Sequence, residues 1–186
     1  VFATNNAYRS IRDQEAALDA IGIPADGAVV GAAQAGASLL EPHETVLVVG
    51  GPGLVEEVEA RGCTLVDDGP CDAVISGLDR QFDYDALRRA GLAIRGGARW
   101  VLTNPDPTFP TPHGLEPGAG ALGAAIRAAG GVDPLIGGKP EGAMAGLIRD
   151  RLGDDGIVVG DRADTDGRFA TALGYRFALV FSGVTT

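Results

Sequence analysis

Residues 156–166 are Gly156-Ile157-Val158-Val159-Gly160-Asp161-Arg162-Ala163-Asp164-Thr165-Asp166, an apolar run that stops at a glycine and is followed by three aspartates. The apolar run is typical of a buried strand, and in an open α/β sheet the ligand site lies outside the carboxyl ends of the strands. Carboxylates at that edge can hold a hard divalent cation such as Mg2+, which takes oxygen ligands. Alternatively, Asp164 or Asp166 caps a helix that begins near Thr165. Capping explains only one carboxylate, so the segment favours a metal or phosphate site.

The overall composition argues against two classes of partner. The sequence has 186 residues, enough for one good-sized domain or two small ones, and its 29 glycines suit many tight turns between strands and helices. The formal net charge is −10, so the phosphate backbone of a nucleic acid would repel this chain. No stretch approaches the roughly 20 apolar residues that span a bilayer. We therefore expect neither a nucleic acid nor a membrane as partner.

The cysteines and histidines do not suggest a metal site of their own. Cys63 and Cys71 are eight residues apart and have no nearby histidine to complete a zinc set. Reduced thiols in a cytoplasmic protein are the expectation, with a disulfide as the alternative. His43 and His113 lie in proline-containing loop sequence, which is typical of surface histidines. The sequence starts at Val1 in what resembles a strand already under way, so we expect both ends to be truncated, and a missing segment could hide a signal peptide.

Short apolar runs alternate with helical patterns along the chain. Strands are predicted at residues 1–4, 46–50, 64–67, 72–76, 99–103, 156–160 and 176–181. Helices are predicted at residues 10–21, 31–40, 53–61, 84–96, 119–129, 141–152 and 166–173, and several of them end at a glycine. Strands that alternate with helices predict an α/β fold built on a parallel sheet with right-handed crossovers.

Residues 104–118 interrupt this alternation with a proline-rich stretch that has no periodicity. A stretch of this length is uncommon in a compact domain and is usually functional. Domain boundaries are indicated at residues 41–44 and 131–134, which would make the middle of the chain a domain inserted into a split outer one. Composition alone does not establish this division.

Three further polar segments lie beside predicted strand ends or helix starts. Thr4-Asn5-Asn6 offers a hydroxyl and two carboxamides next to a helix N-terminus, where they can donate to a phosphate; alternatively, one asparagine forms a turn and Ser10 caps the helix. Gly137-Gly138-Lys139-Pro140 places an ammonium just before a helix, where it can neutralise a phosphoryl group; a solvated lysine is the alternative. Thr103-Asn104-Pro105-Asp106 again follows a strand, although alone it could be only a rigid turn.

One motif points to another class of site. Residues 46–53 run from a strand into Gly50-Gly51-Pro52-Gly53 and a helix, as in dinucleotide-binding folds. The Gly-x-Gly-x-x-Gly pattern fails, because Glu56 and Pro52 occupy glycine positions in the two registers that could match. Dinucleotide binding is kept as an alternative.

Taken together and in this order, the segments resemble the haloacid dehalogenase (HAD) superfamily, specifically its subfamily IIA. The family's second, third and fourth motifs match residues 2–6, 138–140 and 159–166, and the strand end that usually follows matches Ser182-Gly183-Val184-Thr185. Segments around the family's cap match Thr103-Asn104-Pro105-Asp106 and Pro117-Gly118-Ala119-Gly120. No single motif is decisive, but the ordered set is specific. The subfamily includes phosphatases that act on small esters such as glycerol 3-phosphate, phosphoglycolate, pyridoxal phosphate and p-nitrophenyl phosphate.

The resemblance implies a Rossmann-like parallel-sheet core formed by residues 1–42 and 134–186, with an α/β cap inserted at residues 43–133. It also implies a Mg2+-dependent phosphatase, in which an aspartate attacks the phosphorus of a small phosphate ester and water then hydrolyses the aspartyl-phosphate. Homodimers that form through the cap are common in the family, so a homodimer is a further expectation.

The resemblance also implies roles for individual residues. Asp161 would be a Mg2+ ligand, and Asp166 would support the metal directly or through water. Thr4 would hydrogen-bond the phosphoryl group, helped by the backbone of Asn5-Asn6. Lys139 would pair with the nucleophile and with the phosphoryl oxygens.

The family's first motif, Asp-x-Asp, supplies the nucleophile and the general acid/base on a strand upstream of the second motif. The given sequence begins too late to contain that motif, so we expect a fragment of a phosphatase that is inactive alone. The alternative is a non-catalytic module that binds phosphate esters. Pyridoxal phosphate enzymes of the family carry a histidine near the position of Phe109, so a small polyol or glycolate phosphate is favoured over pyridoxal phosphate.

Overall fold

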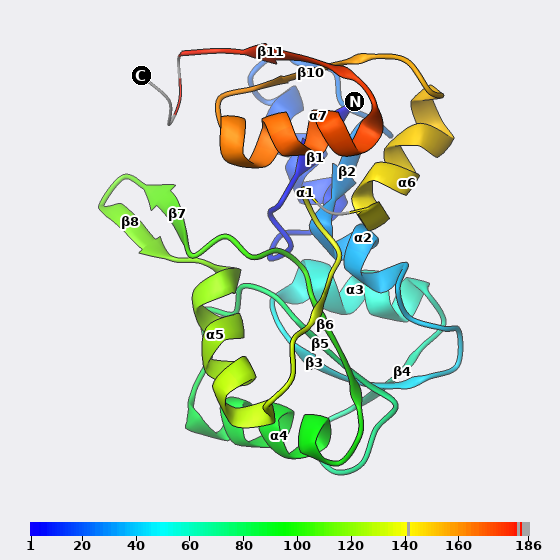
Figure 1. Cartoon of the computed structure of the whole chain (residues 1–186), viewed down its shortest axis with the longest axis vertical. Helices are drawn as coiled ribbons and strands as arrows, with labels where there is room; N and C mark the ends of the chain where they lie inside the picture. Colours follow the sequence, from blue (N-terminus) through cyan, green and yellow to red (C-terminus); the bar gives the residue numbers. More distant parts are fainter. Residues whose placement is uncertain (141, 182, 184–186) are drawn as a thin grey trace.

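The computed structural model describes residues 1–140, 142–181 and 183. Figure 1 shows two parts, one above the other, with both ends of the chain in the upper part. Strands alternate with helices through both parts, and the paired strands run parallel in all sheets but one hairpin. The predicted α/β fold with parallel sheet is confirmed.

The lower part is built on a five-stranded sheet in the order β4-β3-β5-β6-β9. The strands are β3 (Thr45–Val49), β4 (Thr64–Val66), β5 (Ala73–Ser76), β6 (Arg99–Leu102) and β9 (Leu135–Ile136), and the helices are α3 (Pro52–Ala60), α4 (Tyr84–Arg95) and α5 (Ala119–Gly130). Successive strand residues face opposite sides of a sheet. Accordingly, Val74 packs in one cluster with residues of α4 and α5, while Ile75 packs in another with residues of α3. Helices therefore cover both faces, as a parallel sheet requires.

Residues 104–118, predicted as irregular, contain a hairpin. β7 (Thr108–Thr111) and β8 (Gly114–Pro117) pair antiparallel and project from the lower part (Figure 1). Prolines at positions 110 and 117 hide the strand pattern, since proline is confined to edge strands and strand ends.

The upper part contains two separate pairs of parallel strands. β1 (Phe2–Thr4) pairs with β2 (Val29–Gly31), and β10 (Ile157–Gly160) pairs with β11 (Arg176–Leu179). The helices here are α1 (Ile11–Asp19), α2 (Ala32–Ala37), α6 (Gly142–Leu152) and α7 (Arg168–Leu173). Residues of β1 and β10 line one open cavity of about 390 Å3, which we call the slot. Apolar side chains of both strands are exposed, Phe2 to 39% and Val159 to 66%.

Each predicted strand and helix lies within a few residues of an observed one, although residue 141 of one predicted helix lies outside the described residues. β2 and β9 were not predicted, because three and two residues are too few to show a periodicity. β9 pairs with β6, so residues 135–136 lie in the sheet of the lower part, after the predicted boundary at 133/134. The division into core and cap stays a prediction, with its second boundary better drawn after Ile136.

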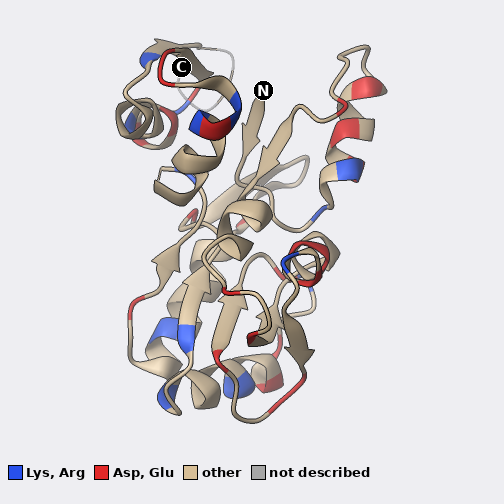
Figure 2. Cartoon of the chain, turned by 90° about the vertical axis from the view of Figure 1, so that its right-hand side faces the viewer, with Lys and Arg blue, Asp and Glu red and all other residues tan. Residues whose placement is uncertain are grey.

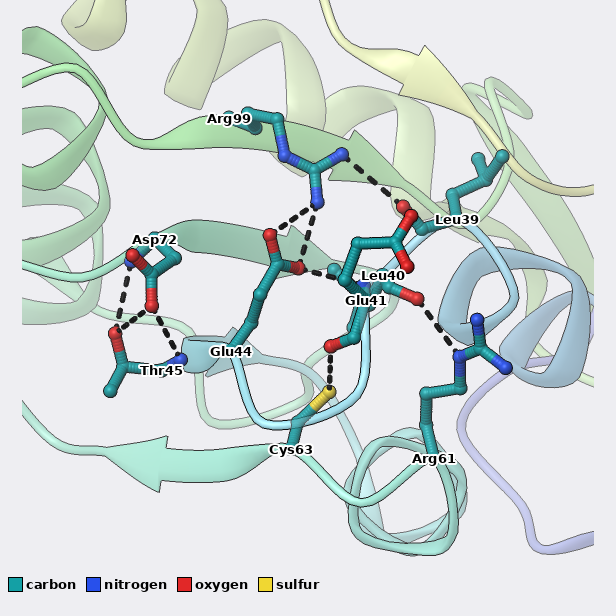
Figure 3. A network of polar contacts seen from close by, with 9 residues as sticks. All are labelled: Leu39, Leu40, Glu41, Glu44, Thr45, Arg61, Cys63, Asp72 and Arg99. Carbon is teal, nitrogen blue, oxygen red and sulfur yellow. Dashed lines mark hydrogen bonds and ion pairs between the residues drawn. The ribbon is translucent and has the colours of Figure 1, made fainter.

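The turn predicted as the first boundary, residues 41–44, is held by a network of polar contacts (Figure 3). The Arg99 guanidinium donates to both carboxylate oxygens of Glu44 at 2.7 Å and to the carbonyl oxygen of Leu39 at 3.2 Å. The Arg61 guanidinium donates to the carbonyl oxygen of Leu40 at 2.8 Å. Both arginines belong to the lower part, so these contacts fix the end of α2 relative to the five-stranded sheet.

Acidic and basic residues are interspersed along the ribbon in both parts of the molecule (Figure 2). None of the helices within the described residues is long and apolar enough to cross a membrane. Cys63 and Cys71 are both free thiols, as predicted.

The glycine turn before α3 packs against the upper part. The Gly53 N–H donates to the Tyr8 carbonyl at 3.0 Å. A Cβ at Gly51 would lie 2.7 Å from Cγ of the Tyr8 ring, and one at Gly53 would overlap the Arg9 carbonyl and lie 2.7 Å from the Ser10 nitrogen. The glycines therefore allow two segments of this chain to approach closely, which accounts for them without a dinucleotide.

We expect Gly53→Ala to lower the free energy of unfolding by about 1–3 kcal/mol, because the new methyl group meets backbone atoms that cannot move aside. The matched control is Gly146→Ala within α6, where a Cβ would have nothing within 4 Å. That control should raise stability by up to about 1 kcal/mol, since alanine favours the helix. Urea unfolding of the two variants measures both effects, and equal stability would contradict the packing role of Gly53.

Candidate functional site

Four polar segments that lie far apart in the sequence meet between the two parts of the molecule. The Lys139 ammonium donates to Oδ1 of Asp166 at 2.7 Å, and the two side chains are only 15% and 9% exposed. The Lys139 backbone N–H donates to Oδ1 of Asn5 at 2.9 Å. Asn5 in turn donates to Oδ2 of Asp106 at 2.9 Å. The solvated-lysine alternative is thereby wrong: Lys139 forms a nearly buried ion pair.

Asp166 is held by a turn of π-helix, Ala163–Gly167, that follows β10. Its second oxygen, Oδ2, accepts from the Arg162 N–H at 3.2 Å, so both oxygens of this nearly buried carboxylate have a partner. A Cβ at Gly160 would lie 2.5 Å from the Asp166 carboxylate, which explains the glycine that ends the strand. The N-cap position of the turn is Arg162, so neither Asp164 nor Asp166 is its N-cap residue, and Asp166 instead accepts from the Arg162 N–H while it pairs with Lys139.

Asp161 lies at the carboxyl end of β10, close to other charges. Arg162 donates to both carboxylate oxygens of Asp164, at 3.3 and 3.0 Å. This hydrogen bond raises the pKa of Arg162, and the charges of Asp106 and Asp161 add to the effect. The same contact lowers the pKa of the Asp164 carboxyl group. Negative charge therefore gathers around a single guanidinium at this edge.

The carboxylates at this edge offer the oxygen ligands that Mg2+ prefers. Asp161 is only partly exposed, and Asp166 lies five residues further on, with both of its oxygens already hydrogen-bonded. In the part of the chain that the structure describes, no three acidic, histidine or cysteine side chains cluster closely enough to hold an ion. The carboxylates of Asp161 and Asp166 fit one side of a magnesium site.

The two asparagines that follow β1 have different partners: Asn6 forms a turn, and Asn5 contacts the site. Asn6 Oδ1 accepts from the N–H groups of Tyr8 and Arg9 at 3.0 and 3.3 Å, and Ser10 caps α1 by accepting from the Asp13 N–H. The turn-and-cap alternative is therefore confirmed for Asn6 and Ser10. Asn5 instead reaches across to Lys139.

A cavity of about 670 Å3 opens beside this segment, lined from the upper part by Thr4, Asn5, Asn6, Tyr8 and Arg9 and from the lower part by Leu78, Arg80, Asn104, Asp106 and Phe109, among others. The Arg80 guanidinium lies 5.8 Å from the centre of the Phe109 ring. Lys139 and Asp166 line the slot instead, together with β1 and β10. Asn5 connects the two spaces, because it lines the cavity and hydrogen-bonds Lys139.

Sequence reasoning missed Arg80, which follows β5 at the carboxyl edge of the sheet, the place where ligand groups gather in α/β folds. It also missed a signal for Lys139, which is the single lysine among 186 residues that include 14 arginines. Ser182, Val184 and Thr185 of the predicted strand end lie outside the described residues.

The comparisons with known proteins agree on one family. The sequence profile of the HAD-hydrolase-like family matches residues 136–186. The D-glycerol 3-phosphate phosphatase of Mycobacterium tuberculosis is 44% identical over the whole chain, and the acid sugar phosphatase of Staphylococcus saprophyticus is 35% identical over the whole chain. The chain spans 55% of the length of the first relative and 74% of the second.

Solved structures show the same likeness. The glycerol phosphate phosphatase of Mycobacterium tuberculosis, in complex with magnesium, matches the whole chain with a TM-score of 0.93 and 42% identity, over 59% of its own length. A thermostable NPPase from Geobacillus stearothermophilus matches the whole chain with a TM-score of 0.94 and 34% identity, over 78% of its own length.

Proposed function

This chain belongs to the haloacid dehalogenase (HAD) superfamily, subfamily IIA, and we propose that it forms most of a Mg2+-dependent phosphatase that hydrolyses a small phosphate monoester. The observation that carries the proposal is the ion pair between Lys139 and Asp166 at the carboxyl end of β10, beside Asp161. A cation and carboxylates held together at a strand edge suit phosphoryl transfer, which depends on positioning and on charge stabilisation.

The slot supports a place for the nucleophile. β1 and β10 each pair with one neighbour among the described residues, and their apolar side chains face the same space. Free strand edges readily pair with a further strand. We propose that a parallel strand carrying the Asp-x-Asp motif fills the slot in the full-length protein and places its first carboxylate near the Lys139 ammonium. Without that strand, residues 1–186 would be inactive.

The hydrolysis would proceed in two steps. An oxygen of the nucleophilic aspartate attacks the phosphorus, the bond to the ester oxygen breaks, and the second aspartate of the motif protonates the leaving alkoxide. Water then attacks the phosphorus of the aspartyl-phosphate and releases phosphate. Thr4 would donate to a phosphoryl oxygen, and Lys139 would neutralise the charge that develops there.

Asp161 would hold Mg2+ directly, and Asp166 would support it through water, since both its oxygens are already engaged. When bound, Mg2+ would neutralise phosphoryl oxygens and hold them in place for attack.

The substrate would enter the cavity between the two parts, with residues 43–136 acting as the cap. Phe109 offers the leaving group an apolar surface, and Arg80 offers it a cation. A small polyol or glycolate phosphate is the proposed class, in keeping with the similarity to the D-glycerol 3-phosphate phosphatase of Mycobacterium tuberculosis. A homodimer through the cap and a cytoplasmic location complete the proposal.

The test is phosphate release by the full-length protein from glycerol 3-phosphate, phosphoglycolate and p-nitrophenyl phosphate. We expect hydrolysis that requires Mg2+, disappears with a chelator and returns when Mg2+ is restored. Binding of these esters without turnover, measured by calorimetry, would instead support the non-catalytic binding module. Binding of NADH with quenching of Trp100 fluorescence would favour the dinucleotide alternative.

A further inference from the structure

The side-chain amide of Asn5 clamps the backbone of Lys139. Its Oδ1 accepts from the Lys139 N–H at 2.9 Å, while its Nδ2 donates to the Lys139 carbonyl at 3.2 Å. A Cβ at Gly138 would lie 2.7 Å from the Asn5 Oδ1, so the glycine before the lysine lets the amide approach. Because these hydrogen bonds fix the backbone of Lys139, they also define the position from which its side chain extends to Asp166.

The clamp works only if the amide oxygen and nitrogen of Asn5 lie on the correct sides. An asparagine amide can flip, and its hydrogen-bond partners decide which way it points. An ionised carboxylate only accepts, and Asp106 Oδ2 lies 2.9 Å from the Asn5 Nδ2. The carboxylate therefore reinforces the orientation that the N–H and carbonyl groups of Lys139 also favour, with Oδ1 facing the Lys139 N–H.

Asp106 is itself held where the connection leaves the five-stranded sheet. Its N–H donates to the side-chain oxygen of Asn104 at 3.1 Å, and its carbonyl accepts from the Gly120 N–H at 2.8 Å. The side chain of Asn104, which is only 5% exposed, also donates to the Asn5 carbonyl at 2.8 Å. Hydrogen bonds therefore connect the base of the β7–β8 hairpin and the start of α5 to Asn5, which in turn binds the Lys139 backbone.

We propose that Asp106 is a positioning residue: acting through the amide of Asn5, it sets the place of Lys139 and links that lysine to the substrate-facing hairpin. The inference rests on the proposed function for the role of Lys139 in hydrolysis. The positioning of the Lys139 backbone by Asn5 and Asp106 is independent of that function, because it depends only on the hydrogen bonds described above.

The first experiment is hydrogen exchange of the Lys139 backbone amide in the full-length protein. Asp106→Ala should speed this exchange about tenfold or more, because the Asn5 amide loses one of its three hydrogen bonds and holds the Lys139 N–H less firmly. Asp106→Asn should keep most of the protection, since its side-chain oxygen still accepts from Asn5. Asp133→Ala, at an exposed aspartate that forms an ion pair with Arg127, is the matched control and should leave the exchange unchanged. Unchanged exchange in Asp106→Ala would overturn the proposal even if the protein hydrolyses nothing.

The second experiment is a double-mutant cycle on kcat. Asp106→Ala alone should lower kcat about 10–100-fold with little change in KM, which is the usual cost of losing a supporting partner of a functional group. In the Lys139→Met background the same change should have no further effect, because residues that act as one unit are not additive. Equal losses in both backgrounds, or an Asp106→Asn variant as impaired as Asp106→Ala, would show that Asp106 acts independently of Lys139.

Discussion

Asp161→Asn in the full-length protein is expected to lower Mg2+-dependent hydrolysis by at least about 100-fold. A bound divalent cation contributes several kcal/mol of charge stabilisation to phosphoryl transfer, and each 1.4 kcal/mol is worth about tenfold in rate. Asparagine keeps the shape of the side chain but loses the charge that attracts the metal. Steady-state kinetics over a range of Mg2+ concentrations measure the effect, and excess metal should restore part of the activity.

The matched control for this change is Asp154→Asn, at an exposed aspartate in the loop before β10. It should leave both the rate and the metal dependence unchanged. Full activity in Asp161→Asn, or a loss shared with Asp154→Asn, would contradict the assignment of Asp161 as a metal ligand.

Lys139→Met is expected to lower kcat by about 10²–10³, because it removes a preorganised cation from the place where phosphoryl charge develops. Metal binding should survive, since the lysine is not a ligand, and calorimetry with Mg2+ would show this. The change also leaves Asp166 buried without its ion-pair partner, and breaking a buried pair costs about 3–5 kcal/mol of stability. Thermal unfolding therefore has to be measured beside the kinetics.

A second variant separates the catalytic loss from the structural one. Asp166→Asn in the Lys139→Met background removes the unpaired charge and should recover most of the stability. It should not recover the rate. If activity returned together with stability, Lys139 would be a structural residue, and its proposed role in catalysis would be wrong.

The helices and strands could be predicted because their patterns are local. The apolar run that ends at Gly160 predicted a strand at residues 156–160, and the observed strand is Ile157–Gly160. β9 escaped prediction because its two residues are a strand only through their pairing with β6. The hairpin at residues 108–117 escaped because prolines hide its alternation. In both cases the strand is defined by its backbone pairing with a second strand, which the local residue pattern does not reveal.

The candidate site shows the same division. A carboxylate after a strand indicated Asp166 and a cation just before a helix indicated Lys139, and the structure joins the two in one ion pair. The partners of Asn5 could not be predicted, because its contacts with Asp106 and Lys139 span 101 and 134 residues of sequence. Nothing local distinguishes a turn-forming asparagine from one that clamps a distant backbone. Asn6 does the first and Asn5 the second.

We propose that the strand carrying the nucleophile lies between β1 and β10, and that the residues at the ends of these two strands contact the same phosphoryl group. A crystal structure of the full-length protein with Mg2+ and beryllium fluoride, an analogue of the phosphoryl group, tests it most directly. We expect a parallel strand in the slot, with the analogue on its aspartate, Lys139 beside the analogue and the metal on Asp161. A slot filled by another element, or a metal bound away from Asp161, would contradict it.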